Sequence, residues 1–346
     1  METIGIFTSK AVSLRNVGRD IAFVAQSKGM VPRLFSYIIP PYEVPELCRK
    51  AIYIMTYSPV WCTHWVLNAY DVYRHGKGIP VLFYGTVEGK IKRHLIRKWM
   101  MDAVPYVANS KYTYEKLVEA GLRVIDIVYH GVNFQEIAEA RKLKQSARNY
   151  IARRTGEGII YGAVLSGHPR KAHEQLLEAF RKARGEAKDI KLYIISKKPI
   201  TPTEGVFLDT KFGEYSRTEL LAIIGAFDYL IIPSYCEGFG LPLVEANALG
   251  VPVIHCMYPP LSEITCDANI TFPYKDIQYV DLQEGILYEY HIYDTKDLAS
   301  AILEARNIVK EEKEKYLKIK NKAVEHAKKF NIMKHYSKLL KLFDKV

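Results

Sequence analysis

Several features that would assign this chain to a particular class of protein are missing from its sequence. The chain has five cysteines, but no Cys-x-x-Cys pair occurs and their spacing fits no zinc site. Scattered cysteines of this kind are typical of proteins in a reducing compartment. No apolar run approaches the roughly 18 residues that a membrane-spanning helix needs. The first residues also lack the charged-then-apolar order of a secretory signal peptide. We therefore expect a cytoplasmic protein.

The charge of the chain favours anionic partners without choosing among them. The formal net charge is +11, which suits phosphates, nucleic acid or an anionic membrane surface. No aromatic RNA-binding motif, helix-turn-helix signal or zinc spacing is present, so we expect no specific nucleic-acid partner. A basic nucleic-acid-binding protein is kept as an alternative.

Short β-type runs alternate with helical stretches along the whole chain. This alternation predicts an α/β protein with parallel sheets covered by helices. The clearest strands of the second half are expected at 159–165, 191–195, 229–232 and 251–254. Turn residues and a change of charge coincide near 155–158, which places a domain boundary there.

The most informative segment is 229–250, with the sequence YLIIPSYCEGFGLPLVEANALG. A buried type of strand leads into a loop with two glycines, and Pro242 follows in the first turn of a helix, where its missing amide hydrogen costs nothing. Such a loop presents free backbone N–H groups to an anion, aided by the positive end of the helix dipole. We expect this loop, Gly238–Leu241, to bind a diphosphate; its members are Gly238, Phe239, Gly240 and Leu241.

Two carboxylates flank the predicted anion site. Glu237 lies in the loop and Glu245 lies in the helix. Carboxylates beside an anion are unfavourable unless they accept hydrogen bonds from hydroxyl groups. We therefore expect Glu245 to bind ribose hydroxyls and Glu237 to bind a transferred sugar. A strand–turn–helix with a capping acid and a solvent-facing glutamate is the plain structural alternative.

The Glu-x7-Glu pattern within PSxxEGFGLPLxEAxAxGxPV resembles glycosyltransferase family four, whose members are retaining enzymes of the GT-B fold. Shorter segments over about 105–310 resemble the family in the same order; they are ANSK at 108–111, HGVN at 130–133, RK at 170–171, LLEAF at 176–180 and LSEI at 261–264. The resemblance implies two Rossmann-like, doubly wound parallel-sheet domains that face each other across a cleft. The implied division is an acceptor-side domain at 1–134, a linker at 135–156, a nucleotide-sugar domain at 157–325 and a returning helix at 326–346.

The resemblance also implies which cations bind the donor diphosphate. Lys171 matches the lysine of the family, whereas the family's arginine lies in a Gly-Arg pair that becomes Gly167-His168 here, leaving Arg170 as the nearby candidate. Positive charge at this point would stabilise the departing diphosphate. No Asp-x-Asp occurs, so we expect no metal and no cofactor, with backbone amides and these cations in the place of an ion.

The first half resembles the family weakly. The family has a glycine-rich turn after its first strand, and the matching loop here holds Asn16-Val17-Gly18, so Gly18 is our candidate for donor contact. The histidine that many members carry after a middle strand is missing. The candidates that could contact an acceptor in its place are Tyr84, Thr86, Glu88 and His64.

A basic segment, KIKRHLIRKW at 90–99, is a further candidate for function. On a helix, Ile91, Leu95 and Trp99 fall on one face. Such a helix suits peripheral contact with an anionic membrane on its inner face. An ordinary surface helix packed on its sheet is the plainer interpretation.

Together these features predict a retaining glycosyltransferase that moves a hexose from a UDP- or GDP-linked sugar to an acceptor on a glycan, a lipid or a protein. Three alternatives stay open. The first is a phosphorylase or sugar-phosphate synthase of the same fold, the second is the nucleic-acid-binding protein, and the third is a degenerate transferase that binds a sugar nucleotide without turning it over.

Overall fold

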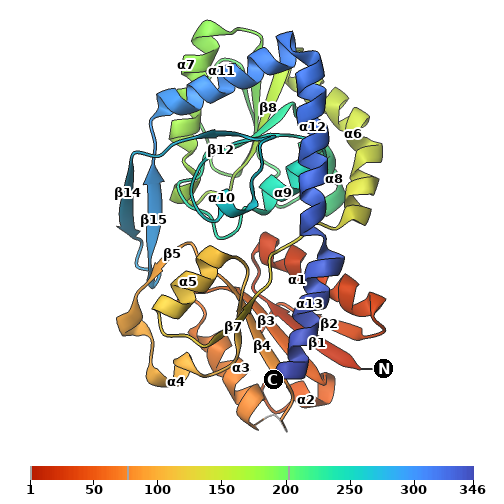
Figure 1. Ribbon diagram of the computed structural model, residues 1–346, viewed down its shortest axis with the longest axis vertical. Coiled ribbons are helices and arrows are strands. Elements are labelled where there is room, and N and C mark those ends of the chain that lie inside the picture. Colours follow the sequence, from red (N-terminus) through yellow and green to blue (C-terminus); the bar gives the residue numbers. More distant parts are fainter. Residues whose placement is uncertain (1, 76–77, 202) are drawn as a thin grey trace.

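The computed structural model describes residues 2–75, 78–201 and 203–346, and it contains one parallel β-sheet in each half of the chain (Figure 1). The first sheet has six parallel strands in the order β2-β1-β3-β4-β6-β7. Its strands are β1 (Thr3–Thr8), β2 (Val31–Phe35), β3 (Lys50–Thr56), β4 (Val81–Thr86), β6 (Tyr106–Ala108) and β7 (Val124–Ile127). The helices of this half are α1 (Val12–Ser27), α2 (Val44–Leu47), α3 (Thr63–His75), α4 (Lys98–Met101) and α5 (Lys111–Glu119).

The second sheet also has six parallel strands, in the order β10-β9-β8-β11-β12-β13. Its strands are β8 (Ile159–Val164), β9 (Ile190–Ile195), β10 (Val206–Asp209), β11 (Tyr229–Ile232), β12 (Val253–Cys256) and β13 (Ile270–Phe272). The two strands at its centre, β8 and β11, contain no charged residue because helices cover both faces of the sheet. Three of the four strands expected in this half match β8, β9 and β11 to within a residue at each end, and the fourth overlaps β12.

The remaining helices belong to the second half of the chain. They are α6 (Phe134–Thr155), α7 (His173–Glu186), α8 (Arg217–Gly225), α9 (Leu241–Ala248), α10 (Leu261–Ile264), α11 (Thr295–Glu311), α12 (Lys313–Ala327) and α13 (Ile332–Lys341). Helix α12 packs against α9, and α13 packs against α1 of the first half, as the blue end of the chain in Figure 1 shows. The chain therefore crosses between its halves twice.

A third, antiparallel sheet joins the two halves directly. It has three strands in the order β14-β15-β5, namely β14 (Asp276–Asp281), β15 (Ile286–Ile292) and β5 (Gly89–Ile91). Strand β5 belongs to the first half of the chain and lies at its boundary with the second (Figure 1). Main-chain hydrogen bonds therefore connect the halves on this side.

The helix expected at 90–99 does not form. Ile91 is buried in β5, a short 3₁₀ turn covers 93–95, and α4 begins only at Lys98. Trp99 packs against the core of the first half, and the centroid of its ring lies 5.6 Å from that of Tyr70. The amphipathic face on which the membrane interpretation depended is thus divided among three elements. Among the described residues, no helix is both long enough and apolar enough to cross a membrane.

Candidate active site between the two sheets

A cleft of about 1070 Å³ lies between the two halves, and residues of both halves line it. In the second sheet, strand order reverses between the neighbouring strands β8 and β11. Ligands of open α/β sheets bind beyond the carboxyl ends of the strands at this kind of reversal. The loops that follow β8 and β11 carry Lys171 and Glu237, and both residues line the cleft.

Two glycines shape the loop after β11. Gly240 has φ of 96°, and a Cβ there would lie 2.4 Å from Cδ2 of Leu261. A Cβ on Gly238 would lie 2.4 Å from Oγ1 of Thr86, across the boundary between the halves. The carbonyl of Gly238 accepts hydrogen bonds from Thr86 Oγ1 at 2.8 Å and Asn109 Nδ2 at 3.2 Å. The first half of the chain therefore holds the loop at the start of α9 in place.

Four charged side chains from opposite sides of the cleft form one ion cluster. Glu237 contacts Lys171 Nζ at 2.5 Å and Arg170 Nη1 at 3.1 Å, and Nη2 of Arg170 contacts Glu88 at 2.6 Å. At most 13% of any of these side chains is exposed. The cluster holds two carboxylates and two cations, so each buried charge has a partner.

Burial and neighbouring charges shift the titration of the cluster. Burial opposes ionisation of Glu237, but the charges of Lys171 and Arg170 and the hydrogen bonds outweigh it and lower its pKa to about 2. Glu88 lies on the other side of Arg170, and burial raises its pKa above the usual range despite that arginine. Burial and the charge of Arg170 lower the pKa of Lys171. Glu237 is therefore a firmly ionised hydrogen-bond acceptor rather than a proton donor.

Glu245 lies in α9 and faces the same cleft. Its Oε1 contacts Nη2 of Arg217 at 2.5 Å, and Nε of Arg217 lies 3.4 Å from Glu136. Sequence reasoning missed Arg217 because no motif marks it. It also gave no role to His130, which lines the cleft with its ring 5.0 Å from that of Phe239. Burial lowers the pKa of His130 to about 3, so the ring is neutral.

The structure brings most of the predicted donor residues together. Arg170, Lys171, Glu237, Glu245 and the Gly238–Leu241 loop all line one cleft, and the buried ring of Phe239 also packs against His130 of the first half.

The turn expected at Gly18 does not form, whereas contact of Gly18 with a donor stays a prediction. Gly18 lies inside α1 rather than in a turn after β1, and it is not among the residues that line the cleft. A Cβ there would lie 2.8 Å from Cγ2 of Thr8, so this glycine lets α1 pack closely on β1.

The acceptor-side candidates separate into two groups. Thr86 and Glu88 line the cleft. Tyr84 is buried, and its hydroxyl donates to the carbonyl of Val128 at 2.6 Å. His64 is exposed on α3 and is not among the lining residues.

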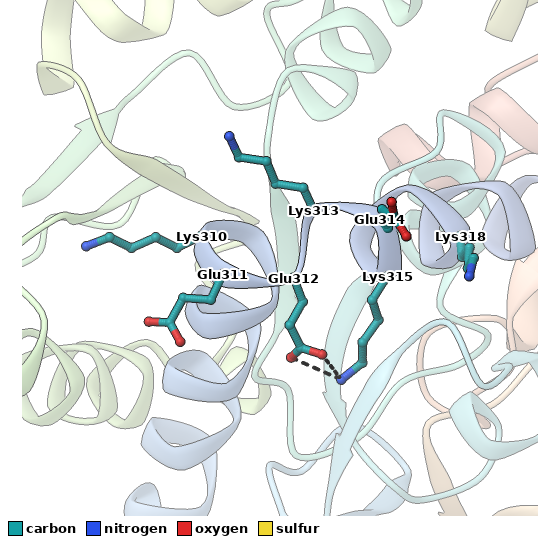
Figure 2. A pocket seen from close by; sticks show the side chains of 7 residues that line it. All are labelled: Lys310, Glu311, Glu312, Lys313, Glu314, Lys315 and Lys318. Carbon is teal, nitrogen blue, oxygen red and sulfur yellow. Dashed lines mark hydrogen bonds and ion pairs between the residues drawn. The ribbon is translucent and has the colours of Figure 1, made fainter.

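A second depression, of about 630 Å³, lies where α11 meets α12 and shares no lining residue with the cleft (Figure 2). Every residue that lines it is a lysine or a glutamate of 310–318, such as the pair Glu312 and Lys315 at 3.0 Å. Both side chains of that pair are about half exposed, so the pair adds little stability. The depression is an ordinary charged surface at a helix junction.

Residues 152–323 match the protein family described as Glycosyl transferases group 1. This part of the chain is a glycosyltransferase group 1 domain. The group 1 domain contains β8 and β11 with their loops, and hence Lys171, Glu237 and Glu245. The expected membership of family four in particular goes beyond this match.

Two curated proteins illustrate the relationship at different lengths. The chain is 29% identical over 344 residues to an uncharacterized glycosyltransferase of Sulfolobus islandicus rod-shaped virus 1, an alignment that covers 97% of this chain and 98% of that protein. It is 33% identical over 104 residues to the MMP alpha-(1->4)-mannosyltransferase of Mycolicibacterium hassiacum, which covers 28% of this chain and 25% of that protein.

Solved structures of similar architecture cover the whole chain. HepE of Anabaena in complex with UDP-glucose matches with a TM-score of 0.69 at 12% identity, covering 100% of both chains. A UDP-forming alpha,alpha-trehalose-phosphate synthase from Burkholderia xenovorans matches with a TM-score of 0.72 at 10% identity, covering 100% of this chain and 99% of that one. At these identities the likeness concerns the fold. The chain has the GT-B fold, as expected from the sequence.

Proposed function

We propose that the protein is a retaining glycosyltransferase of family four that transfers a hexose from a UDP- or GDP-linked sugar without a metal ion. One observation carries the proposal: Lys171, Arg170 and the loop at Gly238 line a single cleft at the strand-order reversal of the group 1 domain. Cations and free backbone amides beside a helix N-terminus are suited to a diphosphate. The UDP-glucose complex of HepE supports a nucleotide sugar as the donor.

In this proposal the donor replaces the internal partners of the two cations. Without a donor, Lys171 and Arg170 neutralise Glu237 and Glu88. A diphosphate would draw both cations toward itself, since its charge is greater than that of a carboxylate. Glu237 would then be free to accept hydrogen bonds from hydroxyls of the transferred hexose. The cations would stabilise the charge that grows on the leaving diphosphate.

The proposed transfer forms one bond and breaks one. The acceptor hydroxyl oxygen bonds to the anomeric carbon on the face from which the diphosphate departs, and the bond from that carbon to the phosphate oxygen breaks. The hydroxyl proton passes to the departing phosphate. We assign no nucleophilic role to Glu237, because in this proposal its carboxylate accepts hydrogen bonds from the hexose hydroxyls. Thr86 and Glu88 are the proposed acceptor contacts of the first half.

We place the reaction in the cytoplasm. All five cysteines are free, and four of them are buried, which fits a reducing compartment. The acceptor is a hydroxyl on a glycan, a lipid or a protein.

A donor panel tests the proposal. The protein is incubated with each common UDP- and GDP-linked hexose, with and without a metal chelator, and thermal stability and nucleotide release are measured. A true donor raises the melting temperature by mass action even when turnover is slow. We expect one base to be preferred and the chelator to have no effect.

Other results would identify the alternatives. Stabilisation without release in the presence of varied acceptors would indicate a degenerate binder. Indifference to every nucleotide sugar, combined with salt-sensitive binding of DNA or RNA, would overturn the proposal in favour of a nucleic-acid-binding protein.

A further inference from the structure

Arg217 is the first residue of α8, and its side chain lines the cleft beside Glu245. The start of α8 is fixed by reciprocal capping: Ser216 Oγ accepts from the amide of Glu219 at 3.3 Å, and the Glu219 carboxylate accepts from the amide of Ser216 at 2.8 Å. Only 12% of the Arg217 side chain is exposed. Its guanidinium is therefore held inside the cleft rather than free in solvent.

Two carboxylates from two helices contact this one guanidinium, and the charge of Arg217 also acts on a third acid, Asp20. Glu245 of α9 lies 2.5 Å from Nη2, and Glu136 of α6 lies 3.4 Å from Nε. Asp20 of α1 belongs to the other half of the chain. Burial raises the pKa of Asp20 to about 7, while the charge of Arg217 opposes that rise and the charges of Glu136 and Glu245 add to it. The acids outnumber the cation, so Arg217 is the group that keeps these carboxylates together.

The two oxygens of Glu245 differ in their contacts. Oε1 is the oxygen that Arg217 holds. Within 2–75, 78–201 and 203–346, no hydrogen-bond donor reaches Oε2. One oxygen is thus fixed, and the other is left to accept a hydrogen bond in the cleft.

We propose that Arg217 is a positioning residue that fixes the Glu245 carboxylate for contact with the ribose hydroxyls of the donor. The inference rests on the function proposed above, and it adds a residue that the motif does not mark. Because Nε and Nη2 lie on one edge of a rigid plane, Arg217 contacts Glu245 and Glu136 together. A lysine offers a single ammonium group and cannot span both in the same geometry.

The test compares nucleotides that differ only in the ribose hydroxyls. Binding of UDP and GDP to the wild-type protein is measured first by calorimetry, followed by the 2′,3′-dideoxy form of whichever binds. In Arg217→Gln we expect the ribonucleotide to bind about tenfold more weakly, the effect of losing a well-placed hydrogen bond to a charged group. The dideoxy nucleotide should bind as it does to the wild type. In turnover, KM for the donor should rise while kcat changes little.

Further variants separate positioning from folding. Arg217→Lys retains the charge and should fold even if the glutamine variant does not. We expect it to lose less affinity than Arg217→Gln, and again only for the ribonucleotide. Glu245→Gln should reproduce the pattern, and adding Arg217→Gln to it should cause no further loss. Arg148→Gln is the matched control, because Arg148 pairs with Asp228 at 3.0 Å and does not line the cleft.

Two results would overturn the inference in different ways. If Arg217→Lys weakens binding of the ribonucleotide and of the dideoxy nucleotide equally, Arg217 contacts the donor directly or acts only through the stability of the fold. The positioning role is then wrong, while the proposed function stands. If the wild-type protein binds neither UDP nor GDP, the proposed function itself fails, and the inference fails with it.

Discussion

At the scale of single residues, Lys171 and Arg170 hold one carboxylate between them, but only Arg170 also contacts the opposite side of the cleft. Lys171→Ala removes one cation from the proposed diphosphate site and leaves Glu237 paired with Arg170. We expect initial rates of nucleotide release to fall by about 100-fold, a typical effect of removing one group that stabilises developing charge.

The matched control for this variant is Lys182→Ala. Lys182 pairs with Glu178 on the exposed side of α7, about 40% of its side chain is solvent-accessible, and it does not line the cleft. Its rates should stay within twofold of the wild type, since exposed ion pairs contribute little. Equal rates for Lys171→Ala and the wild type would remove Lys171 from the mechanism.

A buried histidine of β12 gives the protein a pH-dependent stability. The Nδ1–H of His255 donates to the carbonyl of Cys256, its Nε2 contacts Thr265 Oγ1 at 2.7 Å, and burial lowers its pKa from 6.5 to about 4. Between pH 6.5 and pH 4, His255 therefore binds a proton in the unfolded chain but not in the folded protein. The free energy of unfolding should fall across this window as the pH is lowered, by about 3 kcal/mol from this group.

Denaturant unfolding of His255→Gln between pH 7 and pH 4 checks this expectation. In this variant the free energy of unfolding should fall less steeply as the pH is lowered, even though its value at pH 7 is below that of the wild type. His64→Gln, on the exposed face of α3, leaves the buried ring in place and should keep the slope. An unchanged slope in His255→Gln would show that other groups cause the acid sensitivity.

Residue-scale prediction from sequence succeeded where a local pattern dictates a backbone shape. The glycines at 238 and 240, Pro242 and the two glutamates lie in one continuous segment, so spacing alone placed them around a loop. Gly18 was misassigned because a glycine that permits close helix packing looks like a turn glycine in sequence. Arg217 reaches Glu245 from a different helix, and only the tertiary fold brings the two together.

At the scale of elements, the start of α9 depends on a left-handed residue. Gly240 has φ of 96° and no room for a Cβ. Gly240→Ala should lower the free energy of unfolding by about 2–4 kcal/mol, from backbone strain and overpacking against Leu261. The loop would also move, so donor binding should weaken more than stability alone explains.

The chain offers a matched control for this substitution. Gly185 lies exposed near the end of α7, and a Cβ there would meet no atom within 4 Å. Gly185→Ala should raise the free energy of unfolding by about 0.5–1 kcal/mol through helix propensity. Denaturant unfolding measures both variants, and equal changes in the two would contradict the role given to Gly240.

Elements that depend on distant partners could not be predicted. Apolar runs within the sequence mark the central strands of the second sheet, β8 and β11, so the sequence located them to within a residue at each end. The strand β5 is three residues long and forms by pairing with β15, far along the chain. Local periodicity at 90–99 favoured a helix, but the pairing and the burial of Ile91 outweighed it. The β14–β15 hairpin was missed because its own sequence pattern does not indicate that β15 pairs with β5.

At the scale of the whole molecule, a buried ion pair reinforces the third sheet. Lys116 of α5 contacts Glu289 of β15 at 2.8 Å, with 14% and 8% of the side chains exposed. Lys116→Met leaves a buried carboxylate without its partner, so the free energy of unfolding should fall by on the order of 3 kcal/mol. The radius of gyration from X-ray scattering should rise as the halves separate more often.

The double variant with Glu289→Gln should recover part of that stability, because it removes the unpaired charge. Lys142→Met is the control, since Lys142 pairs with Glu139 on the exposed face of α6. A single variant as stable and compact as the wild type would show that the pair does not hold the halves together.

The third sheet and the α12–α13 crossing lie at opposite sides of the molecule in Figure 1. A body attached to another at two separated places keeps essentially one freedom, which is rotation about the line through both attachments. Sliding and twisting of one half over the other would break backbone pairing at β5 and β15. Donor entry would then proceed by a nodding rotation, in which atoms near that line stay almost still while those farthest from it travel most.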